Sequence, residues 1–138
     1  MQTVYHPRST RLKRLFLLVL AGLLIASAGS AAASSRSNKW RLQFSGGADS
    51  DGVITMRFTP KGGEPIVTET PIKKGTGENA VAKEVVKSLK KQLPPKQFHI
   101  ERDDGEDVLV KRKWGAKTFD YKTVSNTVKG VRINPDKE

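Results

Sequence analysis

The sequence predicts an α+β fold, a two-layer sandwich in which one amphipathic helix packs on an antiparallel sheet of about five to six strands. Several segments alternate apolar and polar residues, one segment repeats apolar residues at helical spacing, and glycine- or proline-rich turns separate them. The predicted order is three strands, the helix and two strands, and the remaining chain allows one or two more. A length of 138 residues suits a single domain.

The three strands before the helix are predicted from period-two patterns. Trp40, Leu42 and Phe44 share one face of the first strand, and charged or amide residues take the other face. The second and third strands cover residues 53–59 and 66–70. Because the turns between them are short and rich in glycine, we expect an antiparallel meander.

The helix is predicted from apolar residues that recur at every fourth position, Val81, Val85, Leu89 and Leu93. Thr76 or Asn79 can cap its first turn, because their side chains accept hydrogen bonds from free backbone N–H groups. Pro94-Pro95 ends it, since proline cannot continue the helical hydrogen bonds. Lysines occupy the opposite surface, so one face of the helix is buried and the other is solvated.

The chain after the helix begins with a second hairpin. Residues 97–102 and 108–113 alternate and flank an Asp- and Gly-rich turn. A short strand is expected around Phe119 and Tyr121, and residues 127–133 form a plausible last strand. Residues 134–138 are expected to be a polar tail.

Residues 1–33 show the three-part pattern of a secretory signal peptide. Basic residues precede an apolar run of about eleven residues, and small residues ending in Ala31-Ala32-Ala33 follow. We expect cleavage after Ala33, with Ala28 as a second option. An uncleaved membrane anchor is the alternative, but the apolar run is short against the ~20 residues that span a bilayer. The prediction is a periplasmic or secreted protein with a flexible segment at 34–38 and one domain at 39–133.

Composition narrows the function classes. The chain has 25 Lys and Arg against 14 Asp and Glu, a formal charge of +11, and no cysteine. Disulfides, thiolate metal sites and cysteine nucleophiles are therefore excluded, and a cysteine-free exported domain is typical of bacteria. His99 is the one histidine after the signal segment, and no nucleophile motif accompanies it. The acidic segments at 49–51 and 103–107 fit turns better than calcium loops. We expect no catalysis, no metal and no cofactor.

The candidate binding residues are basic and include one aromatic ring. They are Lys83, Lys87, Lys90 and Lys91 on the helix, and Lys111, Arg112, Lys113, Trp114 and Lys117 after the second hairpin. Positive charge beside an aromatic ring suits a polyanion. An exported protein meets anionic envelope polymers or lipids more often than nucleic acid, so these are the expected ligands. The alternative is a solvated basic surface with Trp114 packed in the core.

A second candidate surface is the strand around Ile66, Val67 and Thr68. Pro65 and Pro71 flank it, which places it at a sheet edge, where a protein partner could add a strand. The leading hypothesis is therefore a small exported bacterial protein that acts by binding. The alternative is a structural or interaction subunit of an envelope or secreted assembly, and a secreted antibacterial toxin is a lesser alternative.

Residues 40 to about 110 resemble a module of bacteriophage tail proteins and some bacterial surface proteins. Gly52-Val53-Ile54-Thr55 matches its G-x-I-T strand, and Ile72 stands two residues ahead of Lys74-Gly75 before an alanine- and valine-lined helix. Gly75-Thr76-Gly77-Glu78 departs from the acidic residue and threonine that usually begin the helix in that family. The resemblance implies a hairpin, helix and hairpin topology and carries over no catalytic residue.

Overall fold

The computed structural model describes residues 35–138, so the predicted signal peptide lies outside the described residues. The described part contains seven strands and one helix. In chain order these are β1 (Lys39–Ser45), β2 (Gly52–Pro60), β3 (Ile66–Ile72), α1 (Glu78–Gln92), β4 (Phe98–Asp103), β5 (Asp107–Arg112), β6 (Phe119–Asn126) and β7 (Arg132–Lys137).

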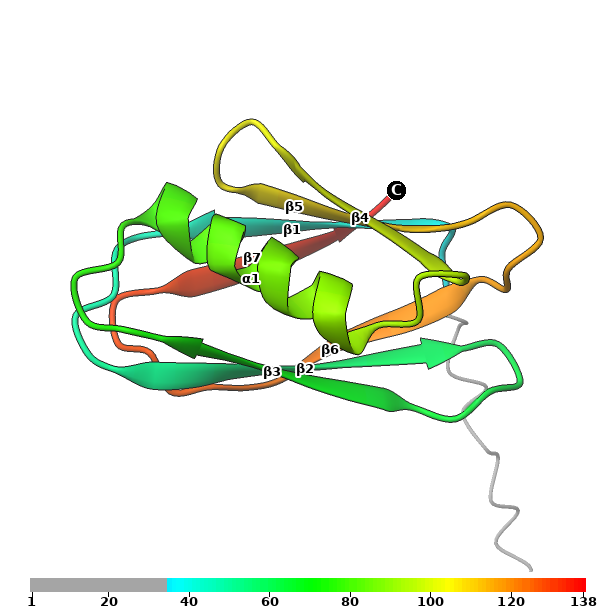
Figure 1. Cartoon of the computed structure of the whole chain (residues 1–138), viewed down its shortest axis with the longest axis horizontal. Helices are drawn as coiled ribbons and strands as arrows, with labels where there is room; N and C mark the ends of the chain where they lie inside the picture. The colour runs from blue at the N-terminus through cyan, green and yellow to red at the C-terminus, as the bar shows by residue number, and fades with distance from the viewer. Residues whose placement is uncertain (1–34) are drawn as a thin grey trace, which may run out of the picture. The chain divides into compact units, whose positions relative to one another are not determined.

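The strands form two antiparallel sheets, ordered β4-β5-β1-β7 and β3-β2-β6, and α1 lies along one side between them (Figure 1). The α+β class is confirmed, but the prediction of a single sheet is wrong. The physical reason lies in the first two strands. Leu42 and Phe44 of β1 and Met56 and Phe58 of β2 are all fully buried. One helix cannot cover that much apolar surface, so the sheets cover each other and the chain changes sheet after β1.

Helix α1 closes the side of the sandwich between the edge strands β3 and β4. Val81, Ala82, Val85 and Leu89 form its buried stripe, as the periodicity predicted. The predicted caps are wrong, because Gly77 takes the N-cap position and no side chain caps the helix. The Thr76 hydroxyl instead donates to the carbonyl of Lys73 in the preceding turn, at 2.7 Å.

The core contains a cluster of aromatic rings centred on Phe58. The Phe58 ring lies 6.1 Å from that of Phe98, 6.2 Å from that of Phe119 and 5.4 Å from that of Tyr121. Trp40 packs on Tyr121 at 5.6 Å, and its indole Nε1 donates to the Phe119 carbonyl at 3.2 Å. These rings come from both sheets, so the cluster ties the sheets together.

The end of the chain corrects two expectations. The last strand is β7, Arg132–Lys137, whereas residues 127–131 form a loop in which Gly130 has a φ of +86°. Residues 134–137, expected as a tail, pair with β1 as an edge strand, with Asp136 opposite Arg41. An exposed edge strand needs few apolar residues, so hydrophobic patterning did not reveal it.

The predicted flexible segment also takes part in the fold. Ser37 exchanges two backbone hydrogen bonds with Phe119, of 2.9 and 3.0 Å. The described residues 35–138 belong to one compact unit, and its core residues lie between Trp40 and Val131. The segment Ser34–Glu138 therefore contains all the described core residues of this fold. Within residues 35–138, no helix is long and apolar enough to cross a bilayer.

Candidate functional site

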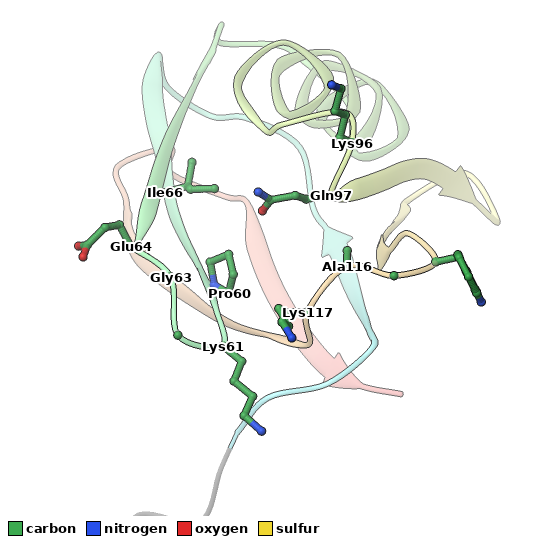
Figure 2. A pocket seen from close by; sticks show the side chains of 12 residues that line it. Pro60, Lys61, Gly63, Glu64, Ile66, Lys96, Gln97, Ala116 and Lys117 are labelled. Atoms are coloured by element: carbon green, nitrogen blue, oxygen red, sulfur yellow. The ribbon is translucent and has the colours of Figure 1, made fainter.

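Three loops meet at the end of the domain where α1 ends. We call the surface that they form the basic end. They are the β2–β3 turn at residues 60–63, the α1–β4 loop at 93–97 and the β5–β6 loop at 113–118. They enclose an open groove of about 710 Å³. In Figure 2, Pro60, Gln97 and Ala116 lie around the hollow, while the side chains of Lys61 and Glu64 extend away from it.

A tight turn displays Trp114 in the β5–β6 loop. The Ala116 N–H donates to the Lys113 carbonyl at 3.0 Å, and Gly115 has a φ of +79°. A glycine with positive φ in the third position is typical of a type II turn, which places Trp114 at the second position. Its side chain is 100% exposed, so the interpretation that Trp114 packs in the core is wrong. Strand β5 ends at Arg112, and the chain leaves the sheet before it reaches the indole.

The β2–β3 connection uses the same kind of turn. The Gly63 N–H donates to the Pro60 carbonyl at 3.0 Å, and Gly62 has a φ of +72°. This places Lys61 at the second position, as Trp114 is placed in the other turn. Both turns therefore present a long side chain to solvent.

Backbone hydrogen bonds hold the three loops together. The Lys113 N–H donates to the Gln97 carbonyl at 2.9 Å, and the Lys61 N–H donates to the Thr118 carbonyl at 2.8 Å. Arg112 adds a side-chain bond from Nη1 to the Ala116 carbonyl at 3.0 Å. The site is thus ordered before any ligand arrives, which lowers the entropy lost on binding.

The basic end carries positive charge that the fold does not neutralise. Within residues 35–138, Lys61, Lys96, Lys113 and Lys117 make no ion pair, and all four are exposed. Glu64 is the one acidic residue among those lining the groove. The surface can therefore attract an anion without first breaking an internal ion pair.

Lys111 does not line the groove, although it shares a neighbouring hollow of about 360 Å³ with Arg112, Lys113 and Trp114. It lies on the outer face of the four-stranded sheet and pairs with Glu101. The hydrogen bond from Lys111, followed by that from His99, holds the pKa of Glu101 below its usual range. The structure thus separates Lys111 from the groove of the basic end.

Arg41 is the centre of a second ion-pair group on that outer face. Its Nη1 contacts Asp107 at 2.6 Å and Asp103 at 3.2 Å, and its Nε contacts Glu138 at 2.6 Å. Bonds from Lys39 and then Arg41 lower the pKa of Glu138. The charges on this face are largely compensated, in contrast to those at the basic end.

The predicted helix lysines lie apart from the groove. Lys83, Lys87, Lys90 and Lys91 are exposed on α1. Lys87 and Lys91 border a separate hollow of about 180 Å³ that also includes Glu84. Lys90 and Lys91 lie in the last turn of α1, where their positive charges interact favourably with the negative end of the helix dipole. The predicted basic set is therefore divided among the loop end, the outer sheet face and the helix.

The predicted partner strand is an edge strand, as expected from its flanking prolines. Ile66, Val67 and Thr68 lie in β3, at the edge of the three-stranded sheet. Helix α1 already uses part of its open edge. Gln92 bonds both the N–H and the carbonyl of Glu69, at 2.9 and 2.8 Å, and Ser88 bonds the same carbonyl.

Prolines remove most of the other donors from that edge. Backbone groups along a strand alternate between its two sides, so Pro65, Val67, Glu69 and Pro71 share the open side. Neither proline has an N–H, and Glu69 is engaged by Gln92. Val67 is left as the one outward donor between Pro65 and Pro71, which is poor support for an added strand.

The candidate catalytic and calcium residues have structural partners. The exposed His99 lies 2.9 Å from the Glu101 carboxylate through Nε2. An Asp51 carboxylate oxygen accepts the Lys74 N–H at 2.7 Å, which stabilises the junction of two loops. No group of three or more metal-ligating side chains is found among residues 35–138.

Sequence reasoning missed three residues of the basic end, Lys61, Lys96 and Gln97. They are far from Lys113 in the chain, and only the fold brings them together. The Pro60-Lys61-Gly62-Gly63 turn was the available signal, because a lysine before a positive-φ glycine must point outward.

Comparisons with known proteins give this chain no family. No family model and no curated protein matches it. The resemblance to the bacteriophage tail module therefore stays a prediction, and function has to be argued from the site.

Proposed function

We propose that this protein is an exported binding protein that holds an anionic component of the cell envelope at its basic end, without catalysis. The observation that carries this proposal is the arrangement of Trp114 and the lysines. A fully exposed indole stands on an ordered turn beside a groove, and the neighbouring lysines have no internal acidic partners.

The chemistry of the basic end favours a ligand with many negative charges. Lys61, Lys96 and Lys117 come from three separate loops and are among the residues that line the groove, and Lys113 precedes Trp114 in one of these loops. A single carboxylate or phosphate can reach one or two of them, whereas a polymer or a charged surface can contact all four. Such binding weakens as salt rises, because counterions compete for both partners.

Export is the second part of the proposal, and its support comes from the pattern of residues 1–33. A cut after Ala33 would release Ser34–Glu138, which still carries an excess of basic residues. An assembly role through β3 has weaker support, since prolines and Gln92 occupy most of that edge.

Binding to soluble polyanions tests the proposal. Purified Ser34–Glu138 is titrated with inorganic polyphosphate and with lipopolysaccharide across a series of NaCl concentrations, and affinity is measured by calorimetry. The test variant is Lys96→Gln/Lys113→Gln/Lys117→Gln, which removes three charges from the basic end. The matched control, Lys83→Gln/Lys87→Gln/Lys90→Gln, removes three charges from exposed positions of α1.

We expect salt-sensitive binding that the test variant weakens by roughly 100-fold and the helix control by less than about threefold, since each lysine near a dense anionic surface contributes about 1 kcal/mol. Equal losses in both variants would mean attraction to net charge alone and would refute a site at the basic end. Absence of binding to either ligand at low salt would refute the proposed function.

A further inference from the structure

We infer that the basic end docks on the surface of an anionic lipid bilayer, with Trp114 inserted among the headgroups. This inference rests on the proposed function and deepens it by naming the ligand class. The features that carry it are the exposed indole, the apolar residues among those lining the groove and the excess of lysines at this end of the domain.

The indole of Trp114 is the first feature. Exposure of 100% gives the ring no packing role in the fold. An indole has a large apolar body and one N–H donor, and this combination favours the boundary between headgroups and acyl chains. A soluble polyanion would account for the lysines, but it would leave the apolar body of the ring in water.

The groove adds a second apolar element between charges. Pro60, Ile66 and Ala116 lie among its lining residues, and Lys96 and Lys117 come from loops on either side (Figure 2). A phospholipid headgroup matches this arrangement, because its phosphate can pair with an ammonium group while its glycerol region contacts apolar atoms. Lysine side chains can also lie along apolar surface while their charged ends stay at the phosphates.

The first described residues, Ser35 and Ser37, are held at the start of β6, next to the basic end. Ser37 pairs with Phe119, the residue after Thr118 of the basic end, and the Ser35 hydroxyl donates to Asp120 at 2.5 Å. The opposite end, around the start of α1, mixes acidic and basic residues and offers no comparable attraction. The basic end is therefore the end of the described domain that an anionic bilayer would attract.

Tryptophan fluorescence tests the inference directly. The segment Ser34–Glu138 contains two tryptophans, the buried Trp40 and the exposed Trp114. The protein is mixed with vesicles of equimolar phosphatidylglycerol and phosphatidylcholine, and with vesicles of phosphatidylcholine alone. Emission maximum, acrylamide quenching and cosedimentation are recorded for the native sequence, Trp114→Ala, Trp114→Tyr and the control Val124→Ser, which alters another exposed apolar side chain.

We expect a blue shift and protection from quenching with anionic vesicles only, and neither change in Trp114→Ala. Cosedimentation should weaken about tenfold in Trp114→Ala, recover in part in Trp114→Tyr and stay unchanged in Val124→Ser, because burial of the ring supplies part of the binding free energy. Since Trp114 touches no core residue, its removal leaves folding intact, and circular dichroism verifies this.

Two results would overturn the inference. One is binding to anionic vesicles with unchanged Trp114 emission, and the other is Trp114→Ala binding as tightly as the native sequence. If polyphosphate and lipopolysaccharide bind at the basic end but vesicles do not, bilayer docking is refuted and the proposed function stands. If neither the polyanions nor the vesicles bind, both proposals fail.

Discussion

Replacing Gly46 by alanine separates two effects that glycine can have in this fold. Gly46 and Gly115 share a left-handed backbone, each with a φ of +79°. A Cβ on Gly46 would lie 2.2 Å from the carbonyl oxygen of Gly130, whereas a Cβ on Gly115 would meet nothing within 4 Å. The Gly115→Ala variant therefore measures backbone strain alone, and Gly46→Ala adds a collision with another loop.

The size of each effect follows from these distances. The left-handed conformation costs an alanine about 1–2 kcal/mol, which is the whole loss expected for Gly115→Ala. In Gly46→Ala, Gly130 must also move, although the neighbouring bond from the Asp49 N–H to the Lys129 carbonyl, 2.8 Å long, restrains its loop. Overpacking of this kind adds about 1–3 kcal/mol, so the expected total is roughly 2–5 kcal/mol.

Urea unfolding of Ser34–Glu138, followed by fluorescence and circular dichroism, gives the free energy of unfolding for each variant. Gly115→Ala should be the more stable of the two and the weaker in binding, because it alters the turn that displays Trp114. Gly46→Ala should bind normally while folded, since it lies at the opposite end. Equal losses of stability in the two variants would refute the argument that loop contact, and not φ alone, determines the cost.

Three further predictions concern the core, the buried phenol and the sheet edge. Phe58→Ala should lower the free energy of unfolding by about 3–5 kcal/mol in urea titrations, because the ring is fully buried and packs against three other aromatic rings. Burial, partly offset by the Thr123 hydrogen bond, raises the pKa of Tyr121 to about 12, so ultraviolet titration of Ser34–Glu138, in which Tyr121 is the one tyrosine, should show a single late phenol. Because folding favours the neutral phenol, stability should be complete below pH 10, the ordinary pKa, and decline from there to about 12. Gln92→Ala should cost about 1–2 kcal/mol and increase self-association in sedimentation, since it frees the Glu69 N–H and leaves the Glu69 carbonyl to Ser88 alone.

Each of the predictions for Phe58, Tyr121 and Gln92 has a result that would contradict it. A phenol that ionises near pH 10 in the folded protein would mean that Tyr121 is accessible to water. If Phe58→Ala lowered the free energy of unfolding no more than the exposed control Val124→Ala does, the aromatic cluster would not stabilise the core as argued. A strictly monomeric Gln92→Ala would show that the flanking prolines suffice to protect the edge.

The strands with alternating apolar residues could be predicted closely. Residues 39–45 carry Trp40, Leu42 and Phe44 on one face, and β1 has the predicted bounds. The helix stripe was also visible, because Val81, Val85 and Leu89 are spaced by whole turns. Local periodicity records which side of an element is buried, and that information lies within a few neighbouring residues.

The pairing of sheets could not be predicted in this way. Periodicity shows that β1 and β2 each bury one face, but it does not show whether they lie side by side or face to face. The six-residue connection from Gly46 to Asp51 was the available hint, since it is long for a hairpin turn. The sequence gives no comparable hint for strand β7. Its pairing with β1 depends on backbone hydrogen bonds, which leave no pattern of side chains in the sequence.

The candidate site was predicted in part, and the reason is its construction from loops. Trp114 and Lys117 are near each other in sequence and both line the groove, and Lys113 lines a neighbouring hollow together with Trp114. Lys111 points to the other side of β5, since successive strand residues alternate, and Glu101 on the neighbouring strand neutralises it. Lys96 could be assigned to the site only once the hydrogen bond from Lys113 to Gln97 was known.

The contrast between the two ends of the sandwich supports a binding role for the basic end. At the end where α1 begins, the Ala48 N–H bonds the Thr76 carbonyl, and Gly46 and Gly130 are in close contact, so these loops stabilise each other. At the basic end, the turn around Trp114 needs only a glycine in its third position, and the space beside Gly115 is empty. Folding therefore requires no particular side chain at position 114. The fold neither needs nor covers this indole, and the lysines around it make no ion pair within residues 35–138, so this end is where we propose that an anionic partner binds.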